Sequence, residues 1–311
     1  MSLEIIHDTF NQFPYSMEMH AYILDYSHSK RQGTSYNCRR IELAPIDRIR
    51  TLAQDISNRF LLADGGIISK YTDVREYDGT CNASAIYRIS ETNPDIDIDL
   101  DLLFQGIADA DTELNPLTMK AGAYLLSGRI RSYNEDHQIK MISMYSPITT
   151  LKNRFLFDNG VFHDISHKVL NLRTTMNVVI IDRTVYLLDM SGETLFNLER
   201  SYKKKSEIAI NEITSMNIIS DAEVFRNTAS AGHNPRRFVA FSQSKLERLS
   251  TKKTREKVAK SFGIALTSDK KFDTSNGENA EKIVKLLCNK AMWDILEEVP
   301  VEVDGSKTWS V

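Results

Sequence analysis

The sequence predicts an α+β fold in which a strand-rich N-terminal domain, residues 1–150, packs with a C-terminal domain, residues 151–311, of short hairpins followed by helices. Runs of β-branched and aromatic residues dominate the first half, which is typical of strands. After Ser191-Gly192 the apolar residues recur at helical spacing. With 41% hydrophobic and 26% charged residues, a chain of 311 residues can bury a substantial core.

Most of the first half is expected to form strands. They are predicted at residues 19–27, 36–43, 83–90, 95–102, 120–130 and 138–145. Pro45 opens an amphipathic helix that continues to Phe60. The segment 95–102 alternates strictly between aspartate and an aliphatic residue, which indicates a half-buried strand with a carboxylate face, and a helix can continue from it. The last two strands are expected to pair around a turn at residues 134–136.

The second half is expected to begin with hairpins and continue with helices. Asp158-Asn159-Gly160 is typical of a hairpin turn. Residues 177–181 and 184–189 are predicted to pair across Asp182-Arg183, and Ser191 with Thr194 can cap a first helix. Further helices are predicted at residues 221–228, 235–249, 254–262 and 278–297.

Charge is distributed unevenly, although the net charge is only -3. Between Ile89 and Leu117 there are eight acidic residues and no lysine or arginine. Between Arg226 and Lys260 there are ten basic residues and only two acidic ones, Glu247 and Glu256. An asymmetry of this size indicates a partner of opposite charge more clearly than the total does.

The basic segment predicts binding to a polyanion, and DNA is the expected partner. Lysine and arginine meet phosphates because each contact releases condensed counterions, which gives affinity that does not depend on sequence. Phe238, Phe241 and Phe262 lie among these bases at helical spacing and are expected in the core. The predicted DNA-binding residues are Lys203, Lys204, Lys205, Arg226, Arg236, Arg237, Lys245, Arg248, Lys252, Lys253, Arg255, Lys257 and Lys260.

Two alternatives from other classes stay open. In the first, Asp95, Asp97, Asp99 or Asp101 holds a divalent metal beside Lys140 in a metal-dependent nuclease. Gln138 stands where a restriction-type nuclease core has its second acid, so a solvated acidic face is the simpler explanation. In the second, the chain is a non-catalytic scaffold whose basic face docks its own acidic segment or a protein partner.

Other site classes find little support in the sequence. Cys38, Cys81 and Cys288 are far apart, which argues against a disulfide framework and a zinc ribbon. His163 and His167 have no third ligand at metal spacing. Phosphate-cradling loops are absent from the sequence, so we expect no cofactor. Because no apolar run approaches the roughly 18–20 residues that span a bilayer, we expect a cytoplasmic protein.

The second half contains a short hairpin pattern that leads into a helix start. The positions of this pattern are Ile181, Asp182, Val185, Tyr186, Leu187, Leu188, Leu195, Phe196, Leu198 and Tyr202. With these positions, and with residues 282–296 similar to a closing helix, the chain over roughly residues 150–311 resembles a known family, the B component of the Kiwa antiphage defence system (KwaB). The strict Phe-Glu of the family pattern is relaxed here, because Asn197 follows Phe196.

This resemblance implies a cytoplasmic DNA-binding effector rather than an enzyme. The family is taken to bind invading phage DNA and block its replication or expression. It works with a small multi-pass membrane partner, KwaA, and as a homodimer or larger assembly. The partner would recruit it to the inner face of the membrane. No catalytic residue set carries over to this sequence, and the first half matches the family only in length and strand-rich character.

Overall fold

The computed structural model describes residues 3–302, apart from residues 30, 32, 46, 63–65, 80–81, 91–95, 97, 111–119, 133–134, 151–154, 165–167, 233, 240, 242, 289–290 and 295–298. The fold is α+β, as predicted. It consists of two compact units. The first unit contains residues 1–77 and 83–198, and the second contains residues 78–82 and 199–311. The boundary expected near residue 150 lies within the first unit.

An eight-stranded sheet forms the centre of the first unit, in the order β2-β1-β5-β6-β11-β12-β4-β3. Neighbouring strands are antiparallel except β3 and β4, which are parallel. The strands are β1 (Met17–Ser29), β2 (Gly33–Ile41), β3 (Asp73–Glu76), β4 (Ala85–Ile89), β5 (Ala123–Ser132), β6 (Glu135–Ser143), β11 (Val178–Ile181) and β12 (Thr184–Leu187). The strands predicted at residues 19–27, 36–43, 83–90 and 120–130 are confirmed.

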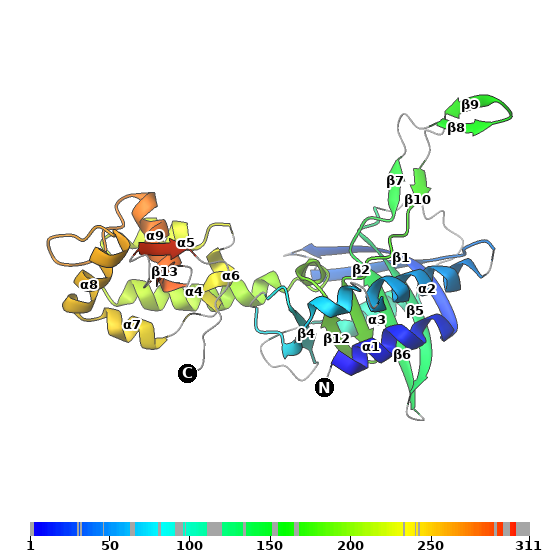
Figure 1. Cartoon of the computed structure of the whole chain (residues 1–311), viewed down its shortest axis with the longest axis horizontal. Helices are drawn as coiled ribbons and strands as arrows, with labels where there is room; N and C mark the ends of the chain where they lie inside the picture. Colours follow the sequence, from blue (N-terminus) through cyan, green and yellow to red (C-terminus); the bar gives the residue numbers. More distant parts are fainter. Residues whose placement is uncertain are drawn as a thin grey trace. The chain divides into compact units, whose positions relative to one another are not determined.

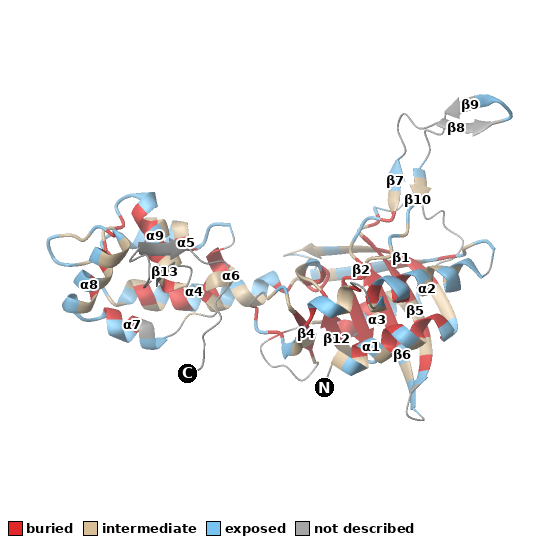
Figure 2. Cartoon of the chain, in the orientation of Figure 1, coloured by how far each residue is buried: buried red, intermediate tan, exposed pale blue. Residues whose placement is uncertain are grey.

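The two faces of this sheet are covered by different helices, because successive side chains of a strand point to opposite sides. Ala21 and Ile23 of β1 belong to a core shared with α1 (Leu3–Gln12) and α2 (Arg48–Leu61). The intervening Tyr22 belongs to a second core, which α3 (Leu100–Ala108) helps to cover. Both cores appear as buried layers around the sheet in Figure 2. The described part of this unit also contains short 3-10 helices, η1 (Phe13–Tyr15), η2 (Ile67–Lys70) and η4 (Met190–Thr194).

The strand predicted at residues 95–102 is wrong in its described part. Asp99 is instead the N-cap of α3, and its carboxylate accepts a hydrogen bond of 3.0 Å from the backbone N–H of Leu102. Leu100 and Leu103 are both buried, so the helical spacing that follows the aspartates decides the local structure. Asp95 and Asp97 lie outside the described residues.

The remaining strands of the first unit form two separate ribbons (green in Figure 1). β7 (Ile148–Thr150) pairs with β10 (Lys168–Leu170), and β8 (Phe155–Asp158) forms a hairpin with β9 (Val161–Asp164). Asn159 and Gly160 have φ angles of 48° and 81° in that hairpin turn. Two positive φ angles are the signature of a tight hairpin turn, so the turn predicted at Asp158-Asn159-Gly160 is confirmed.

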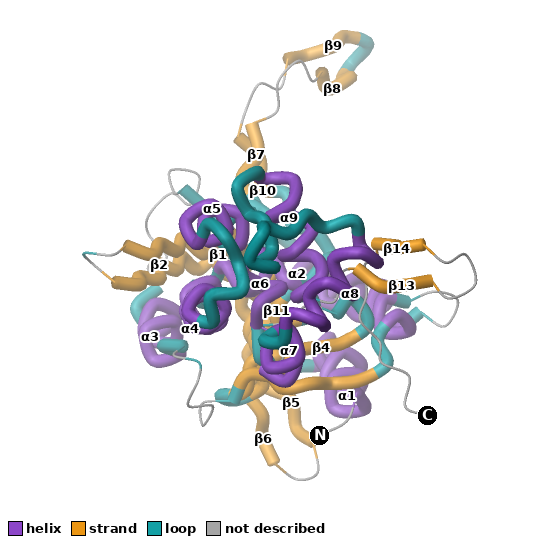
Figure 3. The backbone as a smooth tube through the Cα atoms, turned by 90° about the vertical axis from the view of Figure 1, so that its left-hand side faces the viewer, coloured by secondary structure: helices purple, strands orange, loops and turns teal. Residues whose placement is uncertain are grey.

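The second unit is helical, with one short hairpin (Figure 3). Its elements are α4 (Glu199–Ser215), α5 (Ala222–Ala229), α6 (Asn234–Val239), α7 (Gln243–Leu249), α8 (Lys252–Phe262), α9 (Gly277–Leu287), β13 (Ala291–Asp294) and β14 (Val299–Glu302). Its core contains Phe225, Phe238 and Phe272, which are almost fully buried. Within the described residues, no helix combines the length and the apolar character that crossing a bilayer requires.

Two helix predictions in this unit are only partly right. The helix expected at residues 235–249 is two helices, because the N–H of Phe241 bonds to the carbonyl of Phe238 in a turn that follows α6. The helix expected at residues 278–297 ends at Leu287. Residues 291–294 form β13 instead, since pairing with β14 supplies ladder bonds that outweigh the helical periodicity.

Candidate nucleic-acid interface and a polar sheet pocket

Helix α8 is set by clear signals at both of its ends. Thr251 is the N-cap, and its hydroxyl accepts a hydrogen bond of 3.4 Å from the N–H of Thr254. Gly263 ends the helix in the left-handed region at φ 60°, where glycine carries no steric cost. Arg255 and Ala259 are buried. The opposite side of this helix therefore faces solvent.

Three lysines lie on that solvent side and form the lysine stripe, defined as Lys253, Lys257 and Lys260. Their spacing of four and three residues places them above one another on one helix face. All three are exposed. Two further basic residues are exposed beside the stripe. Lys252 lies on α8, and Arg248 lies on the last turn of α7.

The acid on α8 does little to neutralise the stripe. Glu256 forms an ion pair of 3.0 Å with Lys270, a residue that follows the helix. Lys252 and Lys253 occupy the first turn of α8, where the helix dipole already presents positive charge. Lysine in this position costs helix stability, and the same arrangement strengthens the attraction of an anion.

Arg255 has an internal role, although it lies within the basic segment. It is 5% exposed. Its guanidinium donates to the carbonyls of Leu249 and Ser250, both at 2.7 Å, and to that of Lys270 at 2.6 Å. These bonds tie α8 to the end of α7 and to the segment that follows α8. Its guanidinium is therefore occupied by backbone carbonyls, unlike the exposed lysines around it.

Three further predicted arginines are held by partners inside the second unit. Arg236 stacks over the ring of Tyr202 at 4.6 Å and donates to the carbonyl of Gly79 at 3.2 Å. Arg237 donates to the side chain of Asn234 at 2.9 Å and pairs with Glu281 at 3.8 Å. Arg226 donates to the side chains of Asn211 and Thr214.

The lysines at the start of α4 are separate in sequence from the stripe. Lys203 pairs with Glu199 at 2.5 Å, one helical turn earlier, and this hydrogen bond raises the pKa of Lys203. Lys204 is exposed and Lys205 is half-buried. The side chain of Lys245 lies outside the described residues. As predicted, the interleaved phenylalanines belong to the core, with Phe238 1% exposed.

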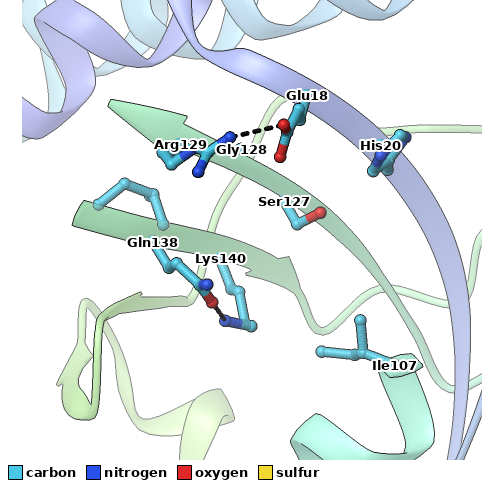
Figure 4. A pocket seen from close by; sticks show the side chains of 9 residues that line it. Glu18, His20, Ile107, Ser127, Gly128, Arg129, Gln138 and Lys140 are labelled. Carbon is cyan, nitrogen blue, oxygen red and sulfur yellow. Dashed lines mark hydrogen bonds and ion pairs between the residues drawn. The ribbon is translucent and has the colours of Figure 1, made fainter. Parts of the chain in front are cut away.

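A second group of polar residues lies in the first unit, and of its members only Gln138 and Lys140 were singled out from the sequence. It is a cavity of about 180 Å³, called here the sheet pocket, on the α3 side of the main sheet (Figure 4). Six of the nine lining residues have polar side chains, and three neighbouring strands supply eight of the nine. It is lined by Glu18, His20, Ile107, Ser127, Gly128, Arg129, Gln138, Ile139 and Lys140. A polar residue at an inward position of each strand is the sequence signal that could have indicated this pocket.

The described carboxylates near α3 do not assemble a metal site. Asp99 caps α3, and Asp101 forms an ion pair of 2.9 Å with Arg183. Within the part of the chain that the structure describes, no group of three histidine, cysteine, aspartate or glutamate side chains could hold a metal ion. Lys140 faces the ring of Phe104 at 4.1 Å. The nuclease hypothesis therefore rests on Asp95 and Asp97, which lie outside the described residues.

Comparison with known proteins identifies the family. A family model described as Kiwa protein KwaB-like matches residues 121–294, which run from the residues before β5 to the end of β13 and make up more than half of the chain. The resemblance inferred from residues 150–311 is thus confirmed over most of its length, and the match begins earlier, at the central strands of the sheet. No curated protein and no solved structure matches the sequence. The chain belongs to the KwaB-like family of Kiwa antiphage defence proteins.

Proposed function

We propose that the chain is the DNA-binding effector of a Kiwa antiphage defence system, and that the lysine stripe of α8 is the centre of its DNA surface. One observation carries this proposal. Lys253, Lys257 and Lys260 face solvent opposite the buried side of α8, and the acid on the same helix is paired elsewhere. Lys252 and Arg248 extend the same basic surface.

The spacing of the stripe suits a phosphate backbone. At a rise of about 1.5 Å per residue, Lys253 and Lys260 are separated by roughly 10 Å along the helix axis. About six phosphates occupy that length of a DNA duplex, so each lysine has a phosphate within reach. Lysines act as point charges without reading base edges, which supports binding to DNA of any sequence. Such binding suits a protein that must recognise phage genomes of unknown sequence.

A stripe of three to five charges gives weak affinity on its own, and this supports an assembled form of the effector. Linked copies convert later contacts into intramolecular events, so affinity rises without new contacts. We propose that the chain acts as a homodimer or larger assembly. A membrane-embedded partner subunit, similar to KwaA, would recruit it to the inner face of the membrane. There it would retain phage DNA and block its replication or expression.

The experiment that tests the DNA surface is a salt titration of DNA binding by a triple variant, Lys253→Gln, Lys257→Gln and Lys260→Gln. Each lost phosphate contact reduces the slope of log affinity against log salt by about 0.9, so the slope is expected to fall by about 2.7. At about 0.15 M salt this corresponds to roughly a hundredfold loss of affinity.

A matched control removes the same charge from lysines that already have partners. Lys70, Lys271 and Lys282 contact the ring of Tyr71, the side chain of Asn217 and Glu278, respectively. Their triple replacement by glutamine is expected to change affinity far less than the stripe variant. Equal losses would mean that net charge, not the stripe, governs binding. Incubating the chain with plasmid and Mg²⁺ or Mn²⁺ also tests the nuclease hypothesis, because a nuclease would cleave the plasmid, whereas a DNA-binding effector would retain it intact.

A further inference from the structure

The sheet pocket is built from two rows of polar side chains that cross three adjacent strands. His20 of β1 is opposite Ser127 of β5, and Ser127 is opposite Lys140 of β6. One row further along, Arg129 of β5 is opposite Gln138 of β6. Residues directly opposite one another on neighbouring strands point to the same face of a sheet. The register of these three strands therefore determines which side chains line the pocket. Ile107 of α3 lines it from the helix side.

A β-bulge in β1 adds Glu18 to this pocket. Met17 pairs with Arg129 and His20 pairs with Ser127, so two residues of β1 stand against Gly128 alone. Glu18 takes a φ angle of 52°, which a residue with a side chain adopts at a cost. The bulge brings its carboxylate to 2.5 Å from the guanidinium of Arg129. Bulges and strained residues cluster at functional sites, where they redirect a side chain.

Lys140 is the most unusual member of the pocket. It is 6% exposed. Among the described residues, its ammonium contacts the side-chain oxygen of Gln138 at 3.4 Å and the ring of Phe104 at 4.1 Å, and no carboxylate lies within ion-pair distance. Burial lowers the pKa of Lys140, and the charge of nearby Asp182 opposes this shift without an ion-pair contact. A buried ammonium with no carboxylate in direct contact costs stability, so an anion in the pocket would supply a partner for it.

Other hydrogen-bond donors line the same pocket. The Nε–H of Arg129 is buried and has no hydrogen-bond partner among the described residues, because Glu18 takes the terminal nitrogen of this guanidinium. Ser127 contributes a hydroxyl, and His20 a ring nitrogen. Burial and nearby Arg40 lower the pKa of His20, so the ring is held toward its neutral form. Glu18 is paired with Arg129, and Asp182 acts on Lys140 only without direct contact, so the ammonium can still take an anionic partner.

We propose that the sheet pocket binds a phosphate group, held by the ammonium of Lys140, the Nε–H of Arg129 and the hydroxyl of Ser127. A cavity of about 180 Å³ has room for one phosphate group. The ligand is a phosphate monoester whose remainder extends out of the pocket. Its source is a free nucleotide or the 5′-phosphate at a DNA end. This proposal stands independently of the lysine stripe, which belongs to the second unit.

The test is calorimetric titration of the full chain with inorganic phosphate and with thymidine monophosphate at constant ionic strength. Saturable binding is expected for the unmodified chain. Lys140→Met is expected to weaken it by about ten- to a hundredfold, the value of a hydrogen bond to a charged group. Lys70→Met is the matched control, because Lys70 also lies over an aromatic ring, that of Tyr71 at 4.7 Å. A thermal melt of each variant shows that it is folded.

A second titration separates the two sources. It uses 5′-phosphorylated and 5′-hydroxyl oligonucleotides with the Lys253→Gln, Lys257→Gln and Lys260→Gln variant, so that α8 does not dominate binding. Preference for the phosphorylated end that disappears with Lys140→Met identifies a DNA end as the ligand, and binding of thymidine monophosphate alone identifies a nucleotide. Absence of saturable binding to any phosphate probe, or equal binding by Lys140→Met, overturns the proposal. If DNA retention fails while phosphate still binds, only the proposed DNA function is refuted.

Discussion

Replacing Lys253 by glutamate is expected to stabilise the chain and to weaken its DNA binding at the same time. Thr251 is the N-cap of α8, so Lys253 is the second residue of the helix, beside unpaired N–H groups and the positive end of the dipole. Lys257 lies one turn later and repels it. Glutamate would reverse both interactions, with a net gain of about 1 kcal/mol after allowance for repulsion from Glu256. The midpoint of thermal unfolding should rise by about 4 °C.

The expected effect on DNA has the opposite sign. Loss of one phosphate contact should reduce the log–log salt slope by about 1 and the affinity at about 0.15 M salt by roughly five- to tenfold. Fluorescence anisotropy with a labelled duplex at several salt concentrations measures both quantities. Differential scanning calorimetry measures the unfolding midpoint of the same samples.

Lys260→Glu is the matched control for this prediction. Lys260 belongs to the same stripe but lies in the last turn of α8, where a cation is favourable. The same charge change should therefore weaken DNA binding to a similar degree and lower the unfolding midpoint. If both variants shift the midpoint in the same direction, the dipole explanation is wrong. If neither variant changes the salt slope, the stripe is not a DNA surface.

Three further predictions concern other parts of the chain. Arg255→Lys keeps the charge but loses the fork that binds three carbonyls, so urea denaturation should show a loss of about 2–4 kcal/mol; an unchanged midpoint would argue against the internal role. Burial raises the pKa of Cys38 to about 12 from 9.0, so iodoacetamide at pH 8 should modify it about a thousandfold more slowly than an ordinary thiol and after the less buried Cys288; equal labelling in peptide maps would contradict this. Burial lowers the pKa of Lys140, so just below pH 10.5 the unfolded chain binds more protons at this residue than the folded chain does. The free energy of unfolding should therefore rise as pH increases toward 10.5. Lys140→Met should flatten that dependence, whereas Lys70→Met should preserve it.

Local signals in the sequence were sufficient for most of the elements. The helix expected at residues 254–262 is α8, which begins two residues earlier, at Lys252. It could be predicted because the Thr251 cap and Gly263 are both local features. The hairpin at Asn159-Gly160 followed from two residues that tolerate positive φ. The end of α9 could not be predicted from helical spacing, since residues 291–294 pair with β14, a contact that the spacing does not show.

The candidate sites show where a charge pattern reaches its limit. Counting bases located the lysine stripe but also included Arg255, whose position on the buried side of α8 with Ala259 was visible from helical spacing. The sheet pocket needed the register of three strands, and two of these, β1 and β5, are about a hundred residues apart in the chain. Alternation assigned each residue to a face, but it could not show that His20, Ser127 and Lys140 share one row.

The three carbonyl contacts of Arg255 have a consequence for proteolysis. The segment from Lys252 to Lys260 is dense in sites for trypsin, which needs an extended backbone in its active site. To present that backbone, the first turns of α8 must detach from Leu249, Ser250 and Lys270, and this opening leaves their carbonyls and a guanidinium to be solvated anew. The segment richest in cleavage sites should therefore be among the last of the exposed helices to be cut, because the arginine at its centre keeps the lysines around it on a folded helix.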